Sequence, residues 1–161
     1  MNFKLKKNQI ERFSRQIVLK DIGIIGQKKI FQSRVLVIGM GGLGCPVAEF
    51  LTRAGVGLLG IIDSDKVDLT NIHRQSLYSN DDIDKFKVKA AKKKLNKINS
   101  ETKIICYNIR LNKLNFGKIV KNYDYVVDGS DNFQTKFELS QQYKGLKTDK
   151  FYWFLENGTR K

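Results

Sequence analysis

A glycine-rich turn between an apolar run and a helical pattern constrains the fold of this chain more than any other feature. Residues 34–39 (RVLVIG) form a short β-branched run, which is typical of a buried parallel strand. Residues 45–54 carry apolar side chains at helical spacing, and residues 58–63 (LLGIID) repeat the strand pattern. Between the first strand and the helix stand Gly39, Gly41, Gly42 and Gly44. The sequence therefore predicts a strand, a turn, a helix and a second strand parallel to the first.

The rest of the chain continues this alternation. Helical spacing returns in three further segments, at residues 86–98, 115–122 and 133–142. Strand patterns precede the second and the third of these segments, at residues 102–107 and 123–128. Such alternation predicts an α/β fold with a doubly wound, mainly parallel Rossmann-like sheet.

The length of 161 residues predicts a single main domain with short additions. We expect an N-terminal helical segment at residues 1–33, a Rossmann-like domain at residues 34–142 and an atypical tail at residues 143–161. The tail is rich in lysine and aromatic residues and lies outside the alternation. Residues 8–20 predict an amphipathic helix. Its apolar side would consist of Ile10, Phe13, Ile17 and Val18.

The charge of the chain narrows the class of partner. Lys and Arg number 30 against 16 Asp and Glu, a net charge of +14, so nucleic acid is the first partner to weigh. The lysines are spread along the chain, however. Base stacking would require aromatic side chains interleaved with them, and most aromatic side chains of this chain are not. An acidic protein or a triphosphate is the better match, and we expect no nucleic-acid partner.

Hydropathy and cysteine content favour a cytoplasmic protein. Nowhere do about eighteen apolar residues follow one another, and the amino terminus lacks the apolar run of a signal peptide, so we expect no membrane association. Cys45 and Cys106 are too few for a disulfide framework, which favours a reducing compartment. Both are expected on or beside the buried sheet, and neither is interpreted as a nucleophile.

The glycine turn meets both tests of a dinucleotide-type fingerprint. It joins a strand to a helix, and Asp63 ends the next strand 24 residues after Gly39. Gly39 permits the tight turn, Gly41 lets the backbone approach a phosphate, and Gly44 lets the helix pack closely on the sheet. The amino terminus of the helix attracts negative charge. Glycines that serve only the turn are the plainer alternative, and the pattern leaves NAD, FAD and ATP open.

The long polar stretch of residues 64–84 distinguishes among these ligands. It contains Arg74, and Lys87 follows at the start of the next helix. Two cations beyond the carboxyl edge of a parallel sheet suit a triphosphate, whereas a dehydrogenase does not need them. Taken singly, each cation has the alternative of a solvated surface charge. The other polar candidates for this site are Asp63, Asp65, Asn71 and Gln75.

These motifs together resemble those of the ThiF/MoeB group within the ubiquitin-activating (E1-like) enzyme superfamily. The resemblance runs from residue 11 to residue 142, with six motifs in order at matching separations. They are residues 12–16 (RFSRQ), the GMGGLG turn followed by Cys45, Asp63 with Asp65, residues 71–75 (NIHRQ), Lys87 and residues 128–132 (DGSDN). Members of this group adenylate small ubiquitin-like sulfur-carrier proteins.

The resemblance implies a role for each matched residue. Asp63 would hold the ribose hydroxyls of ATP, Arg74 and Lys87 would contact its phosphates, and Asp131 would bind Mg²⁺. Arg15 matches an arginine that reaches across a homodimer interface to the partner's triphosphate. The implied reaction is ATP-dependent adenylylation of the C-terminal glycine of a ubiquitin-like sulfur carrier that ends in Gly-Gly. The carrier, of the thiamine or the molybdopterin type, stays open.

The chain also departs from the pattern of the group. Relatives continue with further strands and usually carry two Cys-x-x-Cys pairs that bind zinc, and because this chain has two cysteines in all we expect no zinc. Residues 143–161 lack the apolar, glycine-containing run that would begin the next strand in the group. We therefore expect a C-terminally truncated member.

Two other functions remain as alternatives. One is a non-catalytic remnant that binds nucleotide without turnover, and the other is an NAD-dependent oxidoreductase, which the pair of Arg74 and Lys87 disfavours. At the level of single residues, Asp131 has the alternative of a helix N-cap, and His73 is interpreted as a packing or hydrogen-bonding loop residue.

Overall fold

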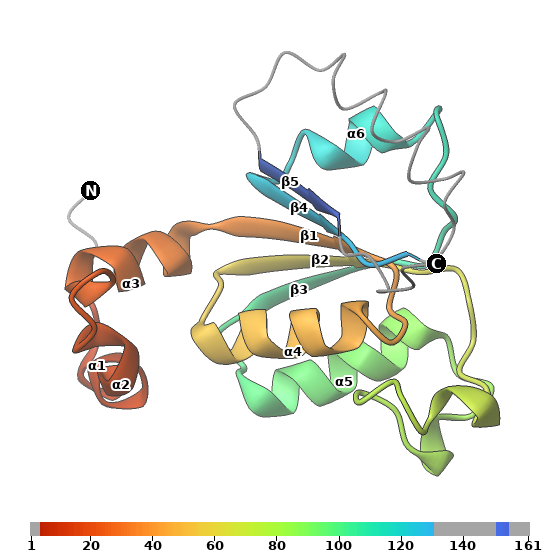
Figure 1. Cartoon of the computed structure of the whole chain (residues 1–161), viewed down its shortest axis with the longest axis horizontal. Helices are drawn as coiled ribbons and strands as arrows, with labels where there is room; N and C mark the ends of the chain where they lie inside the picture. Colours follow the sequence, from red (N-terminus) through yellow and green to blue (C-terminus); the bar gives the residue numbers. More distant parts are fainter. Residues whose placement is uncertain (1–3, 131–150, 155–161) are drawn as a thin grey trace, which may run out of the picture.

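The computed structural model describes residues 4–130 and the strand at residues 151–154. Its centre is a five-stranded sheet in the order β3-β2-β1-β4-β5, in which every neighbouring pair is parallel (Figure 1). The strands are β1 Arg34–Ile38, β2 Leu58–Ile62, β3 Lys103–Tyr107, β4 Tyr125–Asp128 and β5 Phe151–Phe154. This confirms the predicted parallel Rossmann-like sheet.

Strand β1 lies in the middle of the sheet and is buried on both faces. It pairs with β2 on one side and with β4 on the other, so that Leu36 stands between Gly60 and Val126. Leu36 and Val37, which point to opposite faces, are both 0% exposed. Burial on both faces explains why this strand has an unbroken apolar sequence.

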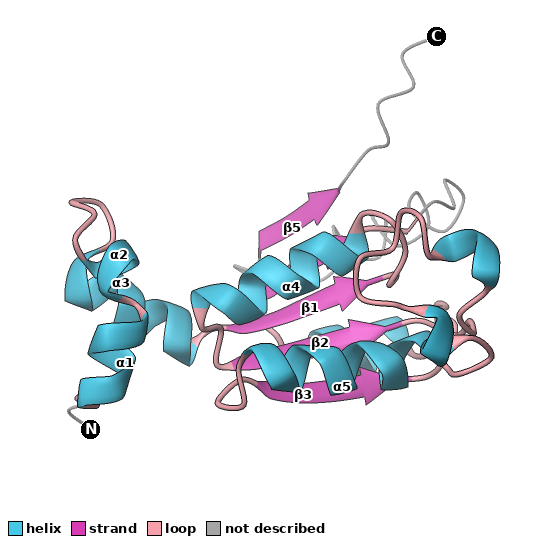
Figure 2. Ribbon diagram, turned by 90° about the horizontal axis from the view of Figure 1, so that it is seen from below, coloured by secondary structure: helices cyan, strands magenta, loops and turns pink. Residues whose placement is uncertain are grey.

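Helices cover both faces of the sheet, as a doubly wound fold requires. The helices α4 Gly44–Ala54 and α5 Lys87–Ile98 lie on one face, and the short α6 Phe116–Val120 lies on the other (Figures 1 and 2). Two apolar cores follow from this arrangement. One joins β1, β2 and β3 to α4 and α5, and the other joins the opposite face of the sheet to α6.

The amino-terminal segment differs from the prediction of one helix over residues 8–20. The structure has two short helices, α1 Lys7–Arg12 and α2 Ser14–Ile17, followed by α3 Gly23–Gln32, which the sequence pattern did not predict. The break falls at Phe13, which is 1% exposed and packs edge-on against Phe31 with ring centroids 5.0 Å apart. The apolar side of the predicted helix is therefore covered in part within the chain.

The carboxyl-terminal tail also contributes to the sheet. The sequence pattern places residues 143–161 outside the alternation, whereas residues 151–154 form β5 and pair with β4 from Tyr125 to Asp128. The predicted helix at residues 133–142 lies outside the described residues, and the predicted domain boundaries stay predictions. In the described part of the chain, no helix has the length and apolarity needed to cross a membrane.

Candidate functional site

A cavity of about 550 Å³ lies at the carboxyl edge of the sheet. Its walls come from the glycine turn after β1, the long loop after β2, the start of α5 and the residues that follow β3 and β4. Between β1 and β4 the order of the sheet changes direction, which is where α/β sheets of this type bind ligands. The volume falls within the range of small-molecule sites, about 300–1,000 Å³.

The glycine turn brings bare backbone to the cavity. Gly39 has a left-handed φ of 80°, and a Cβ at Gly44 would lie only 1.8 Å from the carbonyl oxygen of Gly39. Both positions therefore require glycine for the turn itself. Gly41 and Gly42 instead line the cavity, and a Cβ at either would meet no atom closer than 3.8 Å. Their amides and the start of α4 form a site suited to an anion.

Asp63 stands at the end of β2 and connects two segments of the wall. Its Oδ2 accepts a hydrogen bond from the backbone N–H of Met40 at 2.7 Å, and its Oδ1 accepts one from the backbone N–H of Asp65 at 2.8 Å. Burial raises the pKa of Asp63, and the two hydrogen bonds act in the opposite direction. Each carboxylate oxygen keeps a second lone pair that can accept a ligand hydroxyl.

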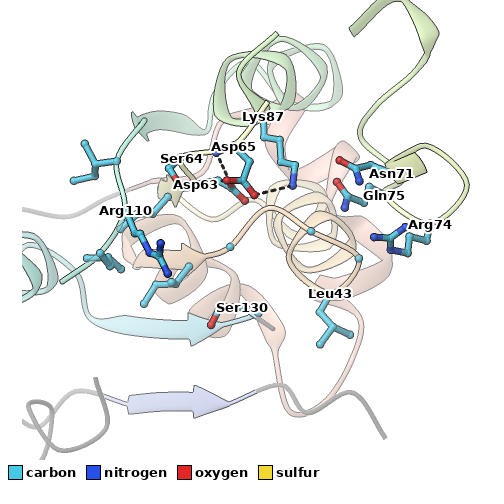
Figure 3. Close-up of a pocket in the computed structure, with 18 residues that line it drawn as sticks. Leu43, Asp63, Ser64, Asp65, Asn71, Arg74, Gln75, Lys87, Arg110 and Ser130 are labelled. Carbon is cyan, nitrogen blue, oxygen red and sulfur yellow. Dashed lines mark hydrogen bonds and ion pairs between the residues drawn. The ribbon is translucent and has the colours of Figure 1, made fainter. Parts of the chain in front are cut away.

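Lys87 supplies a desolvated cation at the start of α5. Its side chain is 8% exposed, and its Nζ lies 3.5 Å from Oδ2 of Asp65, an ion pair visible in Figure 3. The backbone N–H of Lys87 also donates to the carbonyl of Asp65 at 2.9 Å. Because the Asp65 side chain is 67% exposed, this carboxylate can turn away when a stronger anion arrives.

Arg74 lies on the same side of the cavity and is held by the loop. Its Nη1 donates to the carbonyl of Thr70 at 2.7 Å. Thr70 is anchored in turn, since its backbone N–H and its hydroxyl both donate to Oδ1 of Asp68 at 2.8 and 2.6 Å. These hydrogen bonds from Thr70 lower the pKa of Asp68. The guanidinium therefore reaches the cavity from a fixed piece of backbone.

Two amide side chains complete this wall. Asn71 ends the short 3-10 helix Leu69–Asn71. The backbone carbonyl of Asn71 accepts a hydrogen bond from the backbone N–H of Gln75 at 2.9 Å. Gln75 is 3% exposed, and its Oε1 has no hydrogen-bond partner within the described part of the chain. A buried amide of this kind is available to a bound group.

The structure gathers most of the predicted site residues at the cavity and leaves two of the described ones, Gly44 and Arg15, elsewhere. Gly44 packs behind the turn, and Arg15 lies in α2, at the opposite end of the sheet from the cavity (Figure 1). Asp131 lies outside the described residues, but Ser130 lines the cavity. The predicted residues that line it are Gly39, Gly41, Gly42, Asp63, Asp65, Asn71, Arg74, Gln75 and Lys87.

Sequence reasoning missed several lining residues. Those that carry distinct chemistry or shape are Leu43, Ser64, Ile109, Arg110, Leu111 and Ser130. Residues 109–111 follow β3, and Ser130 follows β4, so the signal that could have found them is position after the carboxyl end of a parallel strand.

The cavity wall does not include Cys45 or His73. Within the described residues, no three His, Cys, Asp or Glu side chains group as a metal site. Cys45 is 0% exposed, and burial raises the pKa of its thiol to about 11, so it stays protonated near neutral pH. This burial agrees with the prediction that Cys45 is not a nucleophile.

Comparison with known proteins places the chain in a family. The model of the ThiF family matches residues 13–150. This chain belongs to the ThiF family. The match confirms the resemblance noted in the sequence, and it includes the glycine turn, the loop after β2 and β4.

Curated relatives are similar to this chain over a part of their own length. The chain is 44% identical over 137 residues to the adenylyltransferase and sulfurtransferase MOCS3 of Aedes aegypti, covering 85% of this chain and 31% of the relative. It is 40% identical over 131 residues to the sulfur carrier protein adenylyltransferase of Thermus thermophilus, covering 81% of this chain and 48% of the relative. The chain thus spans about a third to a half of these relatives.

A solved structure shares the fold. The E. coli tRNA N6-threonylcarbamoyladenosine dehydratase TcdA, solved in complex with ATP, is 25% identical with a TM-score of 0.85. The likeness covers 92% of this chain and 60% of TcdA. The fold of that protein, which was solved with ATP, is therefore closely similar to the fold of this chain.

Proposed function

We propose that this chain binds ATP with Mg²⁺ in the cavity and adenylylates the C-terminal glycine of a ubiquitin-like sulfur-carrier protein of the thiamine or molybdopterin type. The observation that carries the proposal is the convergence of Arg74 and Lys87 on a bare glycine turn, with the Asp63 carboxylate beside them. The names of the two curated relatives support the choice of reaction.

The cavity suits the triphosphate and the ribose of ATP. The amides of Gly41 and Gly42 and the two cations receive the triphosphate, which carries about four negative charges. Asp63 accepts hydrogen bonds from the ribose hydroxyls through its free lone pairs. Gln75 can donate a side-chain N–H to the bound phosphates, because its Nε2 lies beside the glycine turn, 3.9 Å from the position that a Cβ of Gly41 would take.

Mg²⁺ prefers oxygen ligands and is commonly held by one or two carboxylates and substrate phosphates. Carboxylates, those of Asp63 and Asp65, line this edge of the cavity. We assign the binding of Mg²⁺ to Asp131, because the residue before it, Ser130, lines the cavity. When bound, the ion offsets charge on the phosphate oxygens.

The reaction needs positioning and charge stabilisation rather than a general base. The carrier's C-terminal carboxylate is already ionised at neutral pH, so its oxygen attacks the α-phosphorus directly. The bond from the α-phosphorus to the bridging oxygen breaks, and pyrophosphate leaves with that oxygen. Arg74 and Lys87 stabilise the charge that develops on pyrophosphate, and the product is an acyl adenylate.

Arg15 acts on the nucleotide of a second chain in this proposal. Because α2 lies at the end of the sheet where the strands begin, Arg15 is far from the cavity of its own chain (Figure 1). The same region carries exposed apolar side chains, including Val18 at 75% and Ile25 at 73% exposure, which a homodimer would cover.

The proposal is tested by exchange of labelled pyrophosphate into ATP. Exchange requires the chain, Mg·ATP and a carrier ending in Gly-Gly, and the same carrier without its last glycine is the matched control. We expect exchange with the complete carrier only, and a loss of about tenfold or more for Arg74→Ala. ATP binding without carrier-dependent exchange would instead support the alternative of a nucleotide-binding protein without turnover.

A further inference from the structure

The strand order predicts where each part of a nucleotide lies, if the chain binds ATP as proposed above. The glycine turn follows β1, Asp63 follows β2, and residues 109–111 follow β3. These strands are neighbours in the order β3-β2-β1. A nucleotide with its phosphates at the turn and its ribose at Asp63 therefore places its base over the end of β3.

Arg110 is the charged side chain at that end of the cavity. Figure 3 shows it on one side of Asp63, with Lys87 and Arg74 on the other. Lys87 pairs with Asp65, and Arg74 donates to Thr70. The guanidinium of Arg110, by contrast, makes no hydrogen bond or ion pair with any residue in the described ranges.

The backbone at Arg110 is fixed although its side chain is exposed. The carbonyl of Arg110 accepts a hydrogen bond from Nδ2 of Asn115 at 3.0 Å. Asn112 closes the same turn, since its Oδ1 accepts the backbone N–H groups of Leu114 and Asn115 at 2.9 and 3.1 Å. Leu111, which is 7% exposed, anchors the segment in the core. Ligand binding therefore has to order only the side chain of Arg110.

The surroundings of Arg110 suit a flat heterocycle better than a phosphate. Ile109, 38% exposed, and Leu111 stand on either side of it in the sequence, and both line the cavity. In Figure 3 the carboxylates of Asp63 and Asp65 stand between Arg110 and the other two cations, so Arg110 does not join Arg74 and Lys87 in a single cationic cluster for the phosphates. Apolar walls and a planar cation with no described partner match a purine ring, on which a guanidinium stacks.

We infer that Arg110 stacks on the adenine ring of ATP and is the residue through which this chain distinguishes ATP from a bare polyphosphate. Arg110 is thus a binding and specificity residue. It takes no part in the transfer of the adenylyl group.

The inference is tested with two ligands that share phosphates and differ in the base. Mg·ATP and magnesium triphosphate are titrated into the full chain, with weak triphosphate binding measured by displacement of ATP. For Arg110→Ala we expect the Kd for ATP to rise about tenfold or more, and the Kd for triphosphate to stay within about twofold. Arg110→Lys keeps the charge but not the planar group, and we expect it to behave like Arg110→Ala.

Arg74→Ala is the matched control, since it should weaken the binding of both ligands. Equal weakening of both ligands in Arg110→Ala would overturn the inference by making Arg110 a phosphate contact. Unchanged ATP binding in Arg110→Ala, or full affinity in Arg110→Lys, would also overturn it. Failure of the wild-type chain to bind ATP at all would instead refute the proposed function, and the inference with it.

Discussion

The carboxylate of Asp63 accepts a hydrogen bond from the backbone N–H of Met40 at 2.7 Å, and this contact fixes the end of β2 against the turn that follows β1. Met40 is itself held from the other side, because its carbonyl accepts hydrogen bonds from the hydroxyl of Tyr78 at 2.9 Å and from Sγ of Cys45 at 3.3 Å. The residue proposed to bind ribose and the turn proposed to bind phosphate are therefore held at a constant separation.

Asp63→Ala should impair both the fold and the site. The change leaves the N–H groups of Met40 and Asp65 without their acceptor, at a cost on the order of 1–3 kcal/mol in the free energy of unfolding. It also removes the proposed contacts to the ribose hydroxyls, so the Kd for ATP should rise about tenfold or more. Urea unfolding and calorimetry measure the two effects. The exposed Asp21→Ala serves as control, and an Asp63→Ala chain with wild-type ATP affinity would remove Asp63 from the site.

The affinity for ATP should depend on pH through Asp63. Burial raises the pKa of this carboxyl, so its protonated form persists to a higher pH than is usual for aspartate. The protonated form offers the ribose hydroxyls a weaker acceptor. We therefore expect ATP affinity to fall as the pH is lowered through the raised pKa, and to recover above it. Calorimetry over a pH series measures this, and an Asp63→Asn chain should show a flatter profile, whereas identical profiles would contradict the assignment.

Two glycines of the turn should respond differently to alanine. In Gly44→Ala the new Cβ would lie 1.8 Å from the carbonyl oxygen of Gly39, so the turn must shift and stability should fall by roughly 2–4 kcal/mol. Gly41 lacks a left-handed φ, and a Cβ there would have 3.9 Å to its nearest neighbour, so Gly41→Ala should change stability by less than about 0.5 kcal/mol.

ATP binding separates the two positions further. The methyl group of Gly41→Ala adds to the wall of the cavity where the phosphates are proposed to lie, so the stable variant should bind ATP more weakly. Thermal unfolding and ATP titration of the same samples provide the comparison. Tight ATP binding by Gly41→Ala would place the phosphates elsewhere.

Arg15 can be tested by mixing two inactive chains. If Arg15 serves the partner's nucleotide, an equal mixture of Arg15→Ala and Asp63→Ala chains forms mixed dimers with one intact site each, about a quarter of all sites after random exchange. Pyrophosphate exchange should recover to about that fraction. Sedimentation that finds monomers throughout, or exchanged subunits without recovery, would show that Arg15 does not act in trans.

The central strands could be predicted from the sequence because burial on both faces leaves an apolar run with sharp ends. The pattern predicts a strand at residues 34–39, and β1 covers Arg34–Ile38. Helix α3 was missed because Gly23 and Gly26 weaken its helical pattern and no side chain caps its start. Strand β5 depends on pairing with β4, a long-range contact that no local pattern in a lysine-rich tail reveals.

The cavity could be predicted only where motifs mark it. The glycine turn, Asp63, Arg74 and Lys87 belong to recognisable patterns, and all line the cavity except the packing glycine, Gly44. Arg110 belongs to no motif. Only the strand order, which places the end of β3 beside that of β2, shows that Arg110 lies at the cavity.

Titration of the wild-type chain with Mg·ATP and, separately, with NADH tests the central claim most directly, because both ligands suit a glycine turn of this kind and only a triphosphate needs Arg74 and Lys87. We predict saturable binding of one ATP per chain, lost in a double Arg74→Ala, Lys87→Ala variant, and no saturable binding of NADH. Saturable binding of NADH that excludes ATP would contradict the account and favour an oxidoreductase.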